Sequence, residues 1–305
     1  MGCNKDKPTE IIDDGVTLPV NPPWGQYHFY ASWSPDGNKI MFVNWDYPNV
    51  PDSMMGLWTV SPDGSNLQPF VVPCLFPQLA VISGGILFYG SDWSPDGRWV
   101  VASINLDIYK LKANGDSLTR LTNMGYCSFP AWSKDGNNIA FTKRADSSGI
   151  WVMDKDGGGL RMLAPNYESP TWLDDNKNVL GLVSSTDPAD GYYLFYLKKI
   201  NIDTGDTILV DTIYGRTLHA QYSPDGSKIV LECQKYLLLP QIYTISAAGG
   251  NHVNLMGDPS VCENIGEHPC WSTDGTKIVY NNCCRDNGKL WIMNADGTGK
   301  YQLTP

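Results

Sequence analysis

Short apolar runs alternate with fixed polar turns along this chain, and the same pattern returns six times. Each copy begins with an aromatic residue that is followed three positions later by Asp-Gly, or by Asp-Asn in the fourth copy. Asp-Gly between apolar runs predicts a hairpin turn, because glycine accepts the positive φ that the turn demands and asparagine also tolerates it. An apolar β-branched residue seven positions after the aromatic begins a second strand. The repeat aromatics, which lie 60, 39, 40, 50 and 49 residues apart, are Trp33, Trp93, Trp132, Trp172, Tyr222 and Trp271.

A second hairpin follows the first in each copy, and five of the six copies share its spacing. Its first strand opens on an apolar–aromatic pair such as Leu57-Trp58 or Ile150-Trp151, and a glycine follows six residues after the aromatic. Six residues further on, an apolar residue indicates a fourth strand. The fourth copy departs from this spacing, because counting back six residues from Gly205 lands on Lys199. The repeat therefore leaves the strand register of the fourth copy open.

Four antiparallel strands in about 40–45 residues cannot bury both sheet faces alone, which is the pattern of a propeller blade. We therefore predict an all-β fold, a six-bladed β-propeller of four-stranded antiparallel blades, with an open solenoid as the alternative. Residues 1–15 are predicted to form a tether, and Val16–Val20 could add an edge strand. Each blade should come from one contiguous repeat, because the last copy ends on its own fourth strand. Within the propeller, residues 16–305, the predicted blades span residues 28–72, 89–123, 128–164, 168–211, 218–257 and 266–305.

Copies such as PAWSKDGNNIAFTKRADSSGIWVMDKDGGGLRMLAP resemble the repeats of the TolB-type β-propeller family. The resemblance covers roughly residues 28–305. TolB carries an additional α/β domain before its propeller, and no such domain is expected within residues 1–305. The resemblance implies the propeller fold and a general capacity for protein binding. It does not imply the particular partners of TolB.

Composition narrows the functional classes. The formal charge of −10 argues against nucleic-acid binding, because proteins that bind phosphate backbones concentrate Lys and Arg. No run of 18 apolar residues occurs, so no segment is expected to span a bilayer. The sequence also lacks a G-x-S-x-G elbow, a Walker loop and a dinucleotide fingerprint, and we predict no cofactor.

The N-terminus and the eight cysteines favour an oxidising compartment outside the cytoplasm, with a set of buried small thiols as the alternative for the cysteines. Met1-Gly2-Cys3 resembles the end of a bacterial lipoprotein signal, with a polar tether after it, although chance could also produce it. Cys3 would then carry the lipid that anchors the chain to the outer membrane of a Gram-negative bacterium, in the periplasm or at the cell surface. The remaining cysteines are expected toward one face, and Cys262 with Cys283 or Cys284 is the favoured disulfide.

Loop lengths distinguish the two faces of the predicted disc. The first and third turns of each blade are nearly invariant, whereas the second-to-third loops and the blade connections vary and emerge on the other face. Long loops on a rigid scaffold concentrate function. In blade one such a loop contains Trp45 and Tyr47, and stiff aromatic loops are typical interface anchors. The alternative is that this loop covers the edge of blade one.

Residues three positions before the repeat aromatics should lie near the mouth of the central channel. They are Tyr30, Gly90, Phe129, Ser169, His219 and His268, with Glu168 and Glu267 beside two of them. Two histidines and a glutamate could ligate a metal or supply an acid and a base. This arrangement also resembles the oligogalacturonate lyase family, whose members are propellers with a histidine-rich channel of this sort.

The sequence as a whole favours a binding scaffold over an enzyme. We predict that the chain engages an envelope protein or polymer through its long-loop face, with no catalytic residues, no bound metal and no obligate oligomer. The membrane is contacted only through the lipid anchor. The alternative is a polysaccharide lyase or hydrolase acting at the channel mouth. The predicted binding residues are Tyr30, Trp45, Tyr47, Phe129, His219, Glu267 and His268.

Overall fold

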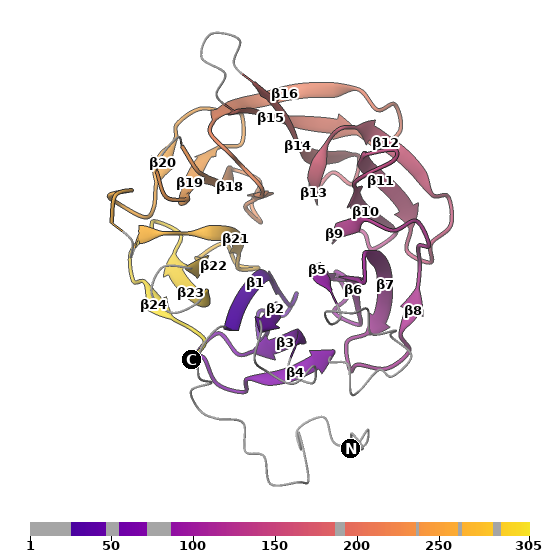
Figure 1. Cartoon of the computed structure of the whole chain (residues 1–305), viewed down its shortest axis with the longest axis horizontal. Helices are drawn as coiled ribbons and strands as arrows, with labels where there is room; N and C mark the ends of the chain where they lie inside the picture. The colour runs from indigo at the N-terminus through magenta and orange to yellow at the C-terminus, as the bar shows by residue number, and fades with distance from the viewer. Residues whose placement is uncertain are drawn as a thin grey trace, which may run out of the picture.

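Six four-stranded antiparallel sheets form a ring in the computed structural model (Figure 1). The structure describes residues 26–46, 55–71, 87–186, 193–235, 238–261, 264–282 and 288–305. Each sheet is built from four consecutive strands, with the first strand innermost and the fourth at the rim. The predicted six-bladed all-β propeller is therefore confirmed. The predictions made for residues 1–15 and Val16–Val20 lie outside the described residues.

The strand bounds follow the repeat. Blades one and two consist of β1 (Gln26–Trp33), β2 (Ile40–Asp46), β3 (Gly56–Val60), β4 (Gln68–Val71), β5 (Phe88–Trp93), β6 (Trp99–Ile104), β7 (Asp107–Lys112) and β8 (Thr119–Arg120). Blades three and four consist of β9 (Cys127–Trp132), β10 (Asn138–Lys143), β11 (Gly149–Asp154), β12 (Arg161–Pro165), β13 (Glu168–Trp172), β14 (Asn178–Thr186), β15 (Tyr193–Asn201) and β16 (Thr207–Tyr214). Blades five and six consist of β17 (Ala220–Tyr222), β18 (Lys228–Cys233), β19 (Gln241–Ser246), β20 (Val253–Asn254), β21 (Glu267–Trp271), β22 (Lys277–Asn282), β23 (Lys289–Asn294) and β24 (Tyr301–Gln302).

The first turn of each blade is held by its own side chains. In blade one the Ser34 hydroxyl donates to Asp36 Oδ1 at 2.6 Å and accepts the backbone N–H of Lys39 at 2.9 Å. The same pairs recur in blades two, three, five and six. In blade four Asn176 takes the glycine position with φ of 53°, as the Asp-Asn variant of the turn predicted.

The glycine of the third turn in each blade faces the preceding blade. Gly249 has φ of 90°, and a Cβ added there would overlap the carbonyl oxygen of Val210 in β16. At the seam between the last and first blades, a Cβ on Gly64 would lie 3.0 Å from the carbonyl oxygen of Leu303. Glycine is therefore required by a backbone contact between blades as well as by the turn. Because Gly64 belongs to blade one and Leu303 to blade six, their contact also joins the last blade to the first.

The register of blade four follows from one extra residue in its third turn. Val179, the β-branched residue of the second strand, pairs with Ile200, which lies five residues before Gly205. In blade three the equivalent partner, Met153, lies four residues before its glycine. Lys198, and not Lys199, therefore occupies the position that is aromatic in the other blades. Its ammonium group lies 6.0 Å from the ring centroid of Tyr167.

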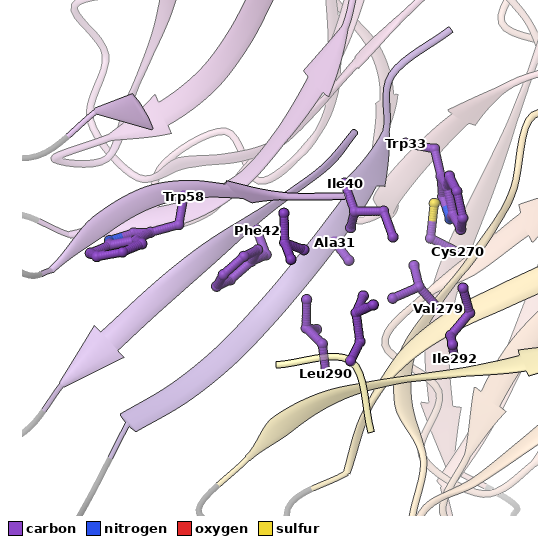
Figure 2. Packing of buried hydrophobic residues seen from close by; sticks show 11 residues of the cluster. Ala31, Trp33, Ile40, Phe42, Trp58, Cys270, Val279, Leu290 and Ile292 are labelled. Atoms are coloured by element: carbon purple, nitrogen blue, oxygen red, sulfur yellow. The ribbon is translucent and has the colours of Figure 1, made fainter. Parts of the chain in front are cut away.

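The hydrophobic core lies between the blades as six clusters, one at each junction of adjacent blades. The repeat tryptophans belong to these clusters and are 4–8% exposed. Figure 2 shows the seam cluster, which contains Trp33, Phe42 and Trp58 of blade one and Cys270 and Leu290 of blade six, with Trp33 beside Cys270. The N–H of His28 also donates to the carbonyl of Gly288 at 2.6 Å. Side-chain packing and this hydrogen bond close the ring.

The cysteine prediction is wrong at one described position. Cys127, Cys233 and Cys270 are buried free thiols. Cys270 is the second-last residue of β21, next to Trp271 and the first turn, so it does not lie toward the variable face. Counting it as the start of its strand misplaced it, because the strand begins earlier, at Glu267. The favoured disulfide involves Cys262, Cys283 and Cys284, which lie outside the described residues, as do Cys3 and Cys74.

Candidate functional site

A cavity of about 330 Å³ lies on the axis of the ring, enclosed by the innermost strands of all six blades. The six residues three positions before the repeat aromatics all line it. The structure therefore brings together Tyr30, Phe129, His219 and His268 around one space. Glu267 is not among the lining residues, although it precedes His268 in β21.

A β-bulge gives five of these residues an unusual backbone. The pairing of the first and second strands shifts at this position in every blade except the fifth. Tyr30, Phe129, Ser169 and His268 consequently have φ between 50° and 54°, a region that bulky residues seldom adopt. Bulges change the direction of a side chain and recur beside functional sites. In blade five the first strand, β17, begins only at Ala220, one residue after His219.

Aromatic side chains form a connected group at one end of the cavity. The Tyr30 ring lies 5.2 Å from Phe129 and 4.5 Å from His268 between centroids, and Phe29 contacts Tyr30 at 5.8 Å. Gly90 leaves room for Phe129, whose Cα would lie 3.4 Å from an added Cβ. Tyr27 stacks on Phe29 at 5.7 Å. We call this group, with the two rings described next, the aromatic mouth; its members are Tyr27, Phe29, Tyr30, Trp45, Tyr89, Phe129 and His268, all half-buried.

Trp45 extends the aromatic mouth toward the second-to-third loop of blade one. It lies opposite Tyr27 in the strand pairing, and its ring is 6.4 Å from that of Tyr89 in blade two. Trp45 is half-buried, so it is neither a core residue nor a fully exposed one. Tyr47, the second anchor predicted in that loop, lies outside the described residues.

A buried acidic residue that sequence reasoning missed, Glu232, is hydrogen-bonded to the backbone of both histidines. Glu232 Oε2 in β18 accepts the backbone N–H of His268 at 2.5 Å, and its own N–H donates to the carbonyl of His219 at 3.3 Å. Burial raises the pKa of Glu232 to about 7. Burial also lowers the pKa of His219 to about 3 and that of His268 to about 4. Both imidazoles are therefore neutral at pH 7, and the carboxyl group titrates near neutrality.

Charged groups flank the aromatic mouth without forming a metal site. Arg144 pairs with Glu168 Oε2 at 2.5 Å, and its guanidinium lies 5.9 Å from the centroid of the Phe129 ring. Within the described part of the chain, no three His, Cys, Asp or Glu side chains come close enough together to hold a metal ion. The arrangement can supply aromatic surface, a charged rim and one group that titrates near pH 7.

The other end of the cavity carries inter-blade hydrogen bonds. Asp92 Oδ2 accepts the backbone N–H of Trp132 in the next blade at 2.8 Å, and Oδ1 accepts that of Trp93 at 2.9 Å. Gln221 Oε1 accepts the N–H of Trp271 at 2.8 Å in the same way. Burial raises the pKa of Asp92 to about 6. Side chains at this position therefore satisfy backbone donors that face the channel from the innermost strands.

Comparison with known proteins supports a TolB-like propeller. An uncharacterized protein of Agrobacterium fabrum is 26% identical over 202 residues, and the match covers 64% of this chain and 65% of that protein, a little under two thirds. The structure assigned to TolB of Agrobacterium tumefaciens is similar, with a TM-score of 0.60 at 23% identity over 71% of this chain and 80% of that one. TolB of Acinetobacter baumannii has a TM-score of 0.64 at 17% identity, over 90% of this chain and 62% of that one. No protein-family model matches the sequence.

A second group of similar structures consists of enzymes. An oligogalacturonate lyase in complex with manganese has a TM-score of 0.56 at 13% identity, over 88% of this chain and 89% of that one. At these identities the likeness shows the fold and not the activity. The chain thus has the fold of TolB-like six-bladed propellers, a fold that also carries lyases.

Proposed function

We propose that this chain is a non-catalytic binding scaffold that engages a protein or polymer of the bacterial envelope through its aromatic mouth. The observation that supports this proposal is the series of half-buried rings that runs from His268 in blade six through blade one to Tyr89 and Phe129. Interfaces draw most of their energy from a few aromatic anchors within a polar rim. Arg144 and Glu168 supply such a rim beside Phe129.

The proposed location is the periplasm or the cell surface. The similarity to TolB proteins supports an envelope role, and the Met1-Gly2-Cys3 sequence supports a lipid anchor at Cys3. The net charge of −10 favours partners other than nucleic acid, because acidic proteins repel phosphate backbones.

Paired substitutions test the role of the aromatic mouth. Immobilised protein is exposed to envelope protein and polymer fractions, and the captured species is then titrated against purified variants. We expect Trp45→Ala with Tyr89→Ala to weaken binding by about 2 kcal/mol, or about 30-fold, as loss of interface anchors does. Leu209→Ala, an exposed residue on the outer strand of blade four, is the matched control and should bind like the wild type. Equal capture by both variants would contradict the proposal.

A polysaccharide lyase is the second candidate. It is favoured by His219 and His268, which line the channel, by the buried Glu232 carboxyl group that accepts the His268 N–H, and by the fold shared with oligogalacturonate lyase. Incubation with oligogalacturonate and Mn²⁺, followed by absorbance of an unsaturated product, tests it. We expect no product. Product formation that His268→Ala abolishes would replace the binding proposal with the enzymatic one.

A further inference from the structure

The outermost strand of blade four differs from the fourth strands of the other blades. β16 runs along the rim of the ring for eight residues, whereas the other five fourth strands have two to five residues (Figure 1). Short length, proline and basic residues protect a sheet edge from pairing with another chain, and three of those five strands contain proline or arginine. β16 has the sequence TILVDTIY, which lacks both and is rich in residues that favour strands. The rim of blade four therefore lacks the usual protection of a sheet edge.

Main-chain groups on the outer side of β16 are open to pairing. In an antiparallel pair, successive residues direct these groups alternately toward the neighbouring strand and away from it. At one end of β16 the Gly215 N–H donates to the Tyr193 carbonyl, and at the other end the Asp206 carbonyl accepts from Asn201. The bulge in the pairing with β15 lies between these ends, at Val210. The residues that face away from β15 are therefore Thr207, Leu209, Thr212 and Tyr214.

The outward groups of these four residues are almost all without a partner. Within the described ranges, β16 pairs with β15 alone, and the Thr212 N–H is the single outward group that is occupied, by the Asp211 carboxylate at 2.7 Å. Apolar side chains lie beside this open edge, since Ile208, Leu209 and Tyr214 are 54–67% exposed. Exposed apolar side chains beside unpaired main-chain groups are typical of a surface that another chain covers.

The edge is complementary to a second copy of itself. When two β16 strands run antiparallel about a twofold axis at their centre, Thr207 of one copy lies opposite Tyr214 of the other. In the same register Leu209 of one copy lies opposite Thr212 of the other. All four residues direct their main-chain groups outward, as hydrogen-bonded pairs require. The side chains also match, because a β-branched residue faces an aromatic ring at each end. A contact that uses the same surface twice is the commonest arrangement in homodimers.

Charges at the two ends of β16 agree with the antiparallel arrangement. Asp203 and Asp206 are exposed in the turn before the strand, and Arg216 is exposed two residues after it. Antiparallel pairing brings the acidic end of each copy beside Arg216 of the other, so opposite charges meet at both ends. A parallel arrangement in register would instead place like charges together. The central Asp211 carboxylate already accepts from Gly250 N–H and contacts His252 Nε2, each at 2.9 Å.

We propose that two copies of this chain associate reversibly by pairing their β16 strands antiparallel, so that blade four of each propeller continues into the other. A strand of eight residues is about 26 Å long, so the contact is small beside the roughly 1,000 Å² that a stable interface buries. We therefore expect a weak dimer with a Kd of about 10–100 µM, which is compatible with a chain that forms no obligate oligomer. This surface lies on the rim and does not depend on the function proposed for the aromatic mouth.

Sedimentation velocity of the full chain, over about 1 µM to 1 mM, tests the association. Leu209→Lys places a charge on the open edge and should weaken the dimer at least about tenfold, while the melting temperature stays unchanged. Thr207→Pro removes an outward N–H at the first residue of the strand, where proline is tolerated, and should act in the same direction. Val253→Lys, the matched control, changes a 53% exposed residue in the short outer strand of blade five and should associate like the wild type.

A charge exchange tests the orientation of the two strands. Asp206→Lys should weaken the dimer about tenfold, because it places like charges together at both ends. Adding Arg216→Glu to that variant should restore the affinity. A double variant that stays as weak as Asp206→Lys would contradict the antiparallel pairing.

Three results would overturn the proposed dimer. They are a monomer at every concentration up to about 1 mM, a dimer that neither Leu209→Lys nor Thr207→Pro weakens, and an equal loss of association in Val253→Lys. Capture by the aromatic mouth is measured below these concentrations, so Leu209→Ala remains a control for that experiment.

Discussion

The two ends of the central channel differ in how they use the repeat. At the end formed by the first turns, five blades hold the same Ser–Asp pair with the same hydrogen bonds, at 2.5–2.6 Å between the side-chain oxygens. At the aromatic mouth, one backbone position carries Tyr30, Gly90, Phe129, Ser169, His219 and His268. Where both backbone and side chain repeat, they serve the fold. At the aromatic mouth the side chain does not repeat, and this marks where partner-specific chemistry can be placed.

The β-bulge shows the same division within single strands. Five innermost strands share the bulge, so the backbone is repeated, while the side chain that it presents changes from blade to blade. Residues held in a sparsely populated conformation persist where the surrounding structure enforces it. A rigid repeated frame thus presents a variable ring of side chains, and the predictions below test each part of this comparison.

The largest effect is expected from removing a repeat tryptophan. Trp132 packs at the junction of blades two and three and is 5% exposed. Trp132→Ala should lower the free energy of unfolding by about 3–5 kcal/mol, because it leaves a void between blades. Chemical denaturation measures the change, with Tyr126→Ala, whose side chain is 56% exposed, as the control. A loss below about 1 kcal/mol would mean that Trp132 does not hold the blades together.

A glycine pair separates the demand of the turn from the contact between blades. Gly226 and Gly249 both have positive φ, but a Cβ on Gly226 would meet nothing within 4 Å, whereas one on Gly249 would overlap the Val210 carbonyl. Gly226→Ala should cost about 1 kcal/mol from conformation alone, and Gly249→Ala about 2–4 kcal/mol. Thermal and chemical melts compare them. Equal losses would show that the contact with Val210 is unimportant.

The repeated part of the molecule could be predicted from the sequence because each feature recurs at a fixed spacing. Five aromatic–Asp-Gly copies and one aromatic–Asp-Asn copy predict six blades, and the third-turn glycines predict the second hairpin of five blades. The reason for those glycines could not be predicted, since the carbonyl that Gly249 faces belongs to the preceding blade. The extra turn residue before Gly205 was also hidden, because only strand pairing shows it.

The candidate site was predicted in part. Spacing from the repeat aromatic placed Tyr30, Phe129, His219 and His268 at the channel, since that position is the same in every blade. Glu232 was missed because it lies in a second strand, and its contact with His268 crosses from blade five to blade six. One signal was present, namely a carboxyl group within the apolar run of residues 229–233 in β18.

Glu232 predicts a pH dependence of stability near neutral pH. Its folded pKa of about 7 lies above the ordinary value of 4.5, so its contribution to stability is full below pH 4.5 and is lost as the pH rises through 7. Between pH 6.5 and 8.5 the wild type should lose about 1 kcal/mol more than Glu232→Gln, which keeps an acceptor for the His268 N–H. His219 and His268, with lowered pKa values, lose stability only as the pH falls below about 6.5. Parallel slopes for the two proteins would show that Glu232 does not titrate in this range.

The smallest effect concerns the aromatic mouth before any partner binds. The rings of Trp45 and Tyr89 lie 6.4 Å apart in an edge-on arrangement, and both side chains are half-buried. Aromatic pairs contribute about 0.5–1.5 kcal/mol beyond buried area, and at this separation we expect the lower end, about 0.5 kcal/mol. A double-mutant cycle of Trp45→Ala and Tyr89→Ala, read by chemical denaturation, isolates this coupling from the cost of each truncation. Coupling of this size would mean that blades one and two hold the two rings together in the free protein, so that a partner meets a preformed surface. Coupling of zero would mean that the rings move independently, and the aromatic mouth would then be assembled only by its ligand.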